Sequence, residues 1–222
     1  MSVPTSRAAS RATSKATSKK DQITFLAASW CLSYPDEQLV DRVPMMRAAL
    51  GEFAGAAQPF AAVLNMLETT GLMALQGQYV QEFDLGKRHA LHLSYWTDGD
   101  TRRRGEVLGA FKKVYRGSDT LVDTWGELPD FLPMVLEYAA TVDMSAGKEL
   151  LQQYRPSLEL IKFGLLRDTL PHSEIVQAIC NSLPGASPAD EQAVMRMAGY
   201  GPPTESVGLD PYDPRLLPMK GA

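Results

Sequence analysis

The chain has 222 residues, of which 45% are hydrophobic and 22% charged, proportions that exclude a collagenous or wholly disordered protein. Five of its 22 basic residues and none of its 26 acidic residues fall in residues 1–20, so the rest of the chain carries a formal charge of −9. A body this acidic repels nucleic acid and anionic lipid headgroups, and it favours a cationic partner.

The first 20 residues repeat a four-residue pattern: SRAA, SRAT, SKAT. In a helix, Arg7, Arg11, Lys15 and Lys19 would repel one another at i,i+4 spacing, and no apolar face would be available for burial. The pattern therefore predicts a disordered basic tail over residues 1–20. A mitochondrial transit peptide has a similar composition, but it also needs an apolar face, which this segment lacks.

Apolar residues recur at helical spacing from residue 21 to residue 198, and proline, glycine and capping residues divide this region into helices. The first helix, residues 21–34, has a predicted inward face made by Ile23, Leu26 or Ala27, Trp30 and Tyr34. A stripe from Leu151 to Leu165 predicts one helix of about 20 residues, bent at Pro156. Other helices are expected at residues 35–51, 57–69, 72–96 with a possible break at 84–86, 100–117, 129–142, 171–183 and 188–198.

No segment shows strict apolar alternation bounded by turns, so the sequence predicts no sheet. Residues 199–222 hold five of the 15 prolines and four glycines, which indicates an irregular Pro/Gly-rich tail. The predicted fold is therefore all-α. It is a single bundle-like domain of about eight or nine helices over residues 21–198, between a disordered N-terminal tail and an irregular C-terminal one.

The sequence lacks the motifs of phosphate-loop, dinucleotide-binding, nucleophile-elbow and zincin enzymes, so it predicts no enzyme. Cys31 and Cys180 lie far apart without metal-ligand spacing, which indicates buried thiols in a reducing compartment. No run approaches the ~18 apolar residues of a membrane span, and the N-terminus has no apolar stretch typical of a secretory signal. A cytoplasmic protein is expected.

Two histidines share one predicted helix face. His89 and His92 have i,i+3 spacing and would hold a metal ion if Glu82 or Asp84 joined them. Such a pair more often forms a polar rim, so the expectation is that the protein binds no metal and no cofactor.

The densest charge cluster lies where a turn leads into a helix; its members are Asp98, Asp100, Arg102, Arg103 and Arg104. Three arginines in the first turns of a helix oppose its dipole, so their charges need acidic partners. The candidates are acids on neighbouring helices, namely Asp84, Glu127 and Asp130, or an anionic ligand. A nucleotide is the weaker alternative, because Asp98 and Asp100 would lie beside its phosphates.

Several motifs together carry a family resemblance. They are the opening FLAASWCLSYPDE, the set Tyr79, Phe83 and Asp84, the D-G-D-x-R-x-R-G turn from Asp98 to Gly105, and E-x-P-D with L-E-Y between Glu127 and Tyr138. With them, residues 23–183 resemble the cytoplasmic assembly chaperones of respiratory nitrate reductase, often called its delta subunit, within the wider family of molybdoenzyme maturation chaperones. One position departs from that pattern. Phe131 stands where the wider family commonly has histidine, so the role of that imidazole does not carry over, and Phe131 is expected to extend an apolar surface.

The resemblance implies an all-helical, non-enzymatic chaperone. Its partner would be the catalytic alpha subunit of nitrate reductase, bound through the N-terminal leader of the apo form until the molybdenum cofactor is inserted and the complex docks at the membrane. The molybdenum cofactor insertion machinery is a second candidate partner. A leader of this type is basic and amphipathic, so it would lay one helix into an acidic, apolar groove.

The expected leader-binding residues are Tyr79, Phe83, Asp84, Tyr95, Trp96, Glu127, Pro129, Asp130, Phe131, Glu137 and Tyr138. About half of the aromatic members are expected to be core residues instead. Two alternatives remain open: a helical interaction module for another client, and a small metal protein centred on His89 and His92. The basic tail resembles a leader in charge, so it is also a candidate competitor for the groove.

Overall fold

A computed structural model describes residues 6–85, 87–99, 103–118 and 126–197. These residues form eleven α-helices and no strand, which confirms the predicted all-α class. The α-helices are α1 (Ser6–Cys31), α2 (Glu37–Gly51), α3 (Ala61–Thr69), α4 (Leu72–Tyr79), α5 (Tyr95–Asp98), α6 (Arg103–Arg116), α7 (Leu132–Thr141), α8 (Met144–Gln153), α9 (Arg155–Arg167), α10 (His172–Asn181) and α11 (Glu191–Met197). Two 3₁₀ turns, η1 (Gln58–Phe60) and η3 (Lys87–His89), and a π-helical turn, η2 (Val80–Asp84), complete them.

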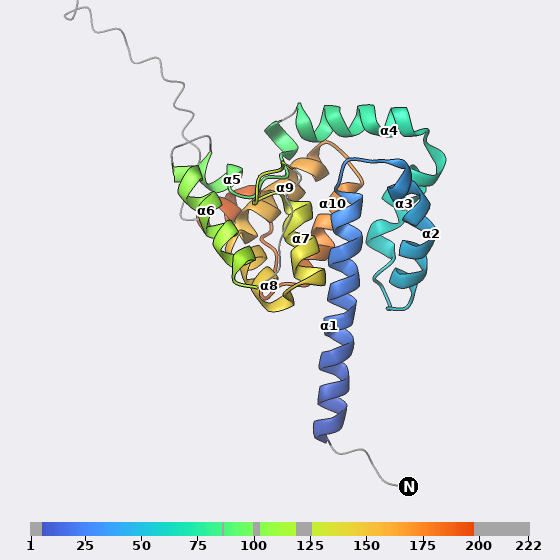
Figure 1. The fold of residues 1–222 in the computed structure, drawn as a ribbon, viewed down its shortest axis with the longest axis vertical. Helices are drawn as coiled ribbons and strands as arrows, with labels where there is room; N and C mark the ends of the chain where they lie inside the picture. The colour runs from blue at the N-terminus through green and yellow to red at the C-terminus, as the bar shows by residue number, and fades with distance from the viewer. Residues whose placement is uncertain (1–5, 86, 100–102, 119–125, 198–222) are drawn as a thin grey trace, which may run out of the picture.

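Helix α1 runs through the middle of the molecule (Figure 1) and packs mainly along α7, with α10 and α2 also in contact. Its buried face carries Phe25, Ala28 and Leu32. The sequence predicted a neighbouring face, and that choice was wrong for Tyr34, which is 50% exposed. The rest of that face packs against the core: Ala27 is buried, and Ile23, Leu26 and Trp30 are partly buried, with the Arg42 guanidinium over the Trp30 ring. Apolar residues occur on most sides of this part of α1, so helical periodicity alone does not decide which side faces the core.

Residues 6–20, predicted as a disordered tail, are helical in the structure and form the start of α1, which projects beyond the other helices (Figure 1). Alanine and the basic residues have high helix propensity, and extending a helix that is already packed needs no new nucleation. These two effects outweigh i,i+4 repulsions of only a few tenths of a kcal/mol each. Residues 1–5 and the predicted C-terminal tail, residues 199–222, lie outside the described residues.

The stripe from Leu151 to Leu165 is buried as predicted, but it belongs to two helices rather than one bent helix. Helix α8 ends at Gln153, and Tyr154 leaves the helical conformation with ψ near 24°. Pro156 then lies in the first turn of α9, where its missing N–H costs no hydrogen bond. The expected 72–96 helix is also divided, into α4, η2, η3 and α5. One break follows Asp84, at the predicted place, and a second, at residues 90–94, was not predicted.

Two glycines allow the backbones of neighbouring elements to approach closely. A Cβ added at Gly147 of α8 would overlap Ala139 of α7, and one added at Gly164 of α9 would lie 2.7 Å from the carbonyl oxygen of Arg88. Both glycines are therefore required by packing rather than by backbone conformation. Among the described residues, no helix has the length and apolar character needed to cross a membrane.

Candidate functional site

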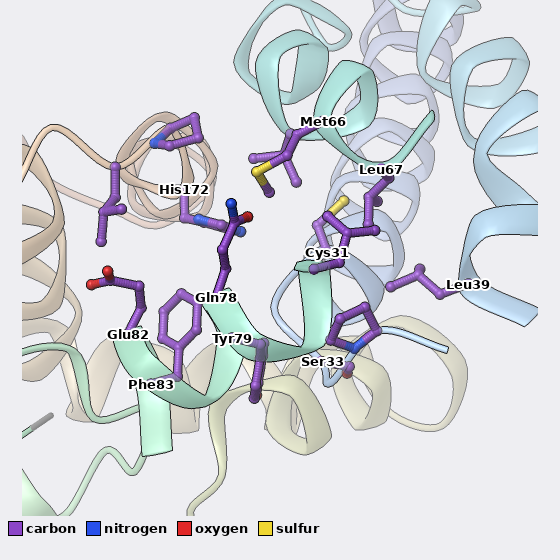
Figure 2. Close-up of a pocket in the computed structure, with 15 residues that line it drawn as sticks. Cys31, Ser33, Leu39, Met66, Leu67, Gln78, Tyr79, Glu82, Phe83 and His172 are labelled. Atoms are coloured by element: carbon purple, nitrogen blue, oxygen red, sulfur yellow. The ribbon is translucent and has the colours of Figure 1, made fainter. Parts of the chain in front are cut away.

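An apolar pocket of about 260 Å³ lies at the C-terminal end of α1 (Figure 2). Five parts of the chain meet there: α1, the start of α2, α3, the α4–η2 segment, and the residues that open α10. Its apolar walls include Cys31, Leu39, Met66, Leu67, Tyr79 and Phe83, and polar side chains at its lining include Ser33, Gln78, Glu82 and His172. In Figure 1, α4 crosses this end of the molecule and joins the α2–α3 pair to the remaining helices.

The α4–η2 segment holds its aromatic side chains in place through α1 and through ring contacts. The hydroxyl of Tyr79 donates to the carbonyl oxygen of Leu32 at 3.1 Å, and the ring packs against Phe83 with centroids 5.0 Å apart. Burial, with smaller contributions from Asp84 and Glu127, raises the pKa of Tyr79, so this hydroxyl stays protonated. The half-exposed Tyr34 meets the Tyr79 ring edge-on at 5.5 Å and extends the apolar surface beside the pocket.

His172 lies in the wall of the pocket and is 9% exposed. Its ring meets Phe83 edge-on at 5.2 Å, and its Nδ1 atom has no hydrogen-bond partner among the described residues. Burial first, and the nearby His89 second, lower the pKa of His172 to about 4, so the imidazole is neutral at pH 7.

The two histidines of the predicted pair face different acids. His89 is buried, with Nδ1 3.2 Å from the Glu82 carbonyl oxygen and Nε2 3.0 Å from the Asp168 carboxylate, although Nε2 lacks hydrogen-bond alignment. His92 instead lies 3.3 Å from the Asp130 carboxylate. Within the described part of the chain, no group of three His, Cys, Asp or Glu side chains is placed to hold a metal ion.

Asp130 has 0% exposure and organises a buried polar network. Its carboxylate accepts hydrogen bonds from the backbone N–H of Ser94 at 3.0 Å and from the Ser94 hydroxyl at 2.5 Å, and the Arg104 guanidinium lies 3.7 Å away. Burial alone would raise the pKa of Asp130, but hydrogen bonds from His92 and Ser94 outweigh it and hold the pKa below its usual value. An internal acid is thus the partner of Arg104, as one of the two sequence alternatives proposed.

The structure separates the predicted leader-binding residues into four groups. Tyr79 and Phe83 line the pocket. Asp130, Pro129 and Tyr138 are buried: the Pro129 carbonyl accepts from the Tyr115 hydroxyl, and Tyr138 packs on the Tyr115 ring, so these residues belong to the core rather than to an open groove. The exposed acids are Asp84, Glu127 and Glu137.

The remaining predicted residues lie around α5 and the start of α7. The Trp96 indole donates to the Ala90 carbonyl oxygen at 2.9 Å, and Tyr95 meets the Trp96 ring edge-on. Phe131 is half-buried against His92, with ring centroids 5.4 Å apart, and its expected part in an apolar surface stays a prediction. In the charged turn, Thr97 donates to the Asp98 carboxylate. Asp100, Arg102 and the side chain of Arg103 lie outside the described residues.

Sequence reasoning missed most of the pocket wall. Met66, Leu67 and His172 come from segments that the motifs do not include, and their helical periodicity marks them only as core residues. The Pro171-His172 pair marks the start of a helix and gives no sign of a ligand.

Comparison with known proteins identifies one family. A family model described as "Nitrate reductase delta subunit" matches residues 47–162. The chain is 36% identical over 160 residues to "Nitrate reductase-like protein NarX" of Mycobacterium tuberculosis, a match that covers 72% of this chain and 24% of that protein. The chain therefore spans about a quarter of the length of that relative.

Two further matches span most of the compared protein. The chain is 33% identical over 165 residues to the Bacillus subtilis "Probable nitrate reductase molybdenum cofactor assembly chaperone NarJ", covering 73% of this chain and 89% of that protein. A crystal structure described as a candidate redox enzyme maturation protein from Archaeoglobus fulgidus has a TM-score of 0.52 at 18% identity, covering 72% of this chain and 91% of the other. At that identity the structural likeness establishes the fold alone.

Proposed function

Because the chain belongs to the nitrate reductase delta subunit family, which includes molybdenum cofactor assembly chaperones, we propose that it is a chaperone of nitrate reductase assembly. Its client is the apo form of the catalytic alpha subunit, bound through the N-terminal leader. The chaperone acts in the cytoplasm and holds the client until the molybdenum cofactor is inserted and the complex docks at the membrane. It works by binding and carries out no catalysis.

The observation that supports this proposal is the apolar pocket at the end of α1. The pocket is lined mainly by apolar side chains, so it suits the apolar side chains of one face of an amphipathic helix. In this arrangement a leader helix inserts those side chains while its backbone stays outside. Tyr79 and Phe83 contact those side chains within the pocket.

Charge also favours a basic client. The chain beyond residue 20 has a formal charge of −9, and Glu82 lies at the pocket itself. The exposed acids Asp84, Glu127 and Glu137 are proposed contacts for leader cations outside the pocket. Such surface contacts increase the rate of encounter and weaken as salt rises.

The test is calorimetric titration with a synthetic peptide that covers the first ~20 residues of the nitrate reductase catalytic subunit from the same organism. A dissociation constant near micromolar, or about −8 kcal/mol, is expected. The affinity should be lower at about 0.3 M salt than at about 0.05 M. No saturable binding at either salt concentration would contradict the proposal.

A matched pair of methionine variants locates the binding surface. Met66 lines the pocket, whereas Met45 is 52% exposed on α2 and does not line it. Met66→Gln is expected to weaken leader binding about 5-fold, since it removes about 1 kcal/mol of apolar contact. Met45→Gln should leave affinity unchanged, and equal losses in the two variants would place the leader elsewhere.

A further inference from the structure

His172 is an exception among the buried and half-buried polar residues at the pocket. The Ser33 hydroxyl donates to the Ser29 carbonyl oxygen at 2.8 Å, the Tyr79 hydroxyl donates to Leu32, and the Glu82 carboxylate lies 3.4 Å from His89. His172 has a buried Nδ1 atom with no partner among the described residues. A buried polar atom left without a partner costs about 1–3 kcal/mol, so native proteins seldom keep one that has no use.

The chemistry around His172 limits what the pocket accepts. The ring is neutral at pH 7 and meets the Phe83 ring edge-on, and the pocket lining also holds the Gln78 amide, the Glu82 carboxylate and the Cys31 thiol, whose pKa burial raises to about 12. A lysine or arginine head would pair with the Glu82 carboxylate rather than with the neutral ring, and a carboxylate would be repelled by Glu82. A side-chain amide brings more polar groups than Nδ1 can satisfy.

We propose that His172 is the specificity residue of this pocket, and that its Nδ1 atom pairs with the hydroxyl of one serine or threonine on the inserted face of the leader helix. A hydroxyl both donates and accepts, so it pairs with either tautomer of the imidazole. It is also small enough to enter among apolar side chains. The inference rests on the proposed function and deepens it by naming the polar group that the pocket recognises.

Recognition of one hydroxyl discriminates between leaders. A leader that presents only apolar side chains leaves Nδ1 unpaired inside the complex. A buried hydrogen bond contributes about 0.5–1.5 kcal/mol net, which corresponds to about 2- to 12-fold in affinity. Apolar contacts would thus supply most of the affinity, and His172 would select among helices of similar hydrophobicity.

The experiment crosses a peptide series with two protein variants. Each serine of the leader peptide is replaced singly by alanine and each threonine by valine, and every peptide is titrated into the wild-type chain, His172→Leu and His172→Asn. One position should lose about 2- to 12-fold in affinity for the wild type and nothing for His172→Leu. His172→Asn keeps a polar atom near the place of Nδ1 and should retain part of the preference.

Thermal melting separates recognition from a structural role. Because Nδ1 has no partner in the free protein, His172→Leu should melt at or above the wild-type temperature while it binds the parent leader more weakly. A lower melting temperature for His172→Leu would make His172 a structural residue and overturn the inference.

The peptide series tests the inference even without the protein variants. If the wild type binds the leader but no single serine or threonine replacement weakens binding, or if a leader without these residues binds equally well, the inference is overturned and the proposed function stands. Failure of the wild type to bind any leader peptide would overturn both.

Discussion

Asp130 is a buried residue that holds the protein's own segments together. A carboxylate with no exposure cannot contact a client. Instead it joins the 92–94 segment to the start of α7 and neutralises Arg104. The motif that contains Asp130 therefore specifies how two segments pack together. Asp130 would therefore affect client binding only by fixing the positions of those two segments.

Removal of this carboxylate should destabilise the protein. We expect Asp130→Ala to lower the free energy of unfolding by about 3 kcal/mol, because Ser94 loses its acceptor and the partly buried Arg104 charge loses the Asp130 carboxylate. Urea unfolding measures the loss. Glu137→Ala, an exposed acid on α7, is the control and should change stability by less than about 0.5 kcal/mol. An unchanged stability for Asp130→Ala would contradict this account of the network.

His172 predicts a specific pH dependence of stability. Its pKa in the folded protein, about 4, lies below its ordinary value of 6.5, so between these values the unfolded chain binds more protons. The stability contributed by the neutral ring is complete above pH 6.5 and is lost as the pH falls toward 4. Acidification from pH 7 is therefore expected to lower the free energy of unfolding.

The protonation of His172 is expected to lower the free energy of unfolding by about 2 kcal/mol between pH 7 and pH 5. Urea unfolding of the wild type and of His172→Leu at both pH values isolates it, since His89 and His92 are common to the two proteins. Asp130 and Glu159 have pKa values held below 3.8 and 4.5, so they contribute mainly below this window. If both proteins lost equal stability, the ring would not be buried as described.

At the scale of elements, α7 and α8 depend on the close approach of Gly147 to Ala139. Gly147→Ala should destabilise the protein by about 1–3 kcal/mol, because the added methyl overlaps Ala139 and the helices must separate. Gly109→Ala on α6 is the matched control. A Cβ there meets nothing within 4 Å, so higher helix propensity should raise stability by about 0.5–1 kcal/mol. Changes of the same sign in guanidinium unfolding would contradict the packing argument.

The sequence predicts best those elements whose limits are set by residues close to them in the chain. The start of α2 has a local signal, because the Asp36 side chain caps the helix by accepting from the Leu39 N–H. The inward face of α1 depends on neighbouring helices that no local pattern describes. The division between α8 and α9 has a local signal in Pro156, but proline fits a bend as well as a helix start. The pocket is harder to predict, since its walls come from five segments, and the motifs contain only Cys31, Ser33, Pro35, Tyr79 and Phe83 of its lining.

The whole molecule separates its charges along α1. The basic residues of the first 20 lie toward the N-terminal end of α1, whereas the pocket lies at its C-terminal end, beside Cys31. At 1.5 Å per residue, Lys15 and Arg7 lie about 24 and 36 Å from Cys31 along the helix axis. Lys19 is also engaged elsewhere, 3.7 Å from Glu52. The idea that this segment competes with the leader for the pocket is therefore incompatible with an intact α1.

Neutralising the segment tests that separation. In the full chain, Arg7, Arg11 and Lys15 replaced together by glutamine should leave leader affinity within about 2-fold at 0.1 M salt, because the Debye length there is about 10 Å. At about 0.01 M salt, where screening reaches about 30 Å, the variant should bind a basic leader slightly more tightly, since the protein has become more acidic. Calorimetric titration at both concentrations measures the change. A gain of more than about 5-fold at 0.1 M salt would show that the first turns of α1 unwind and reach the pocket, because only direct occupation survives that screening.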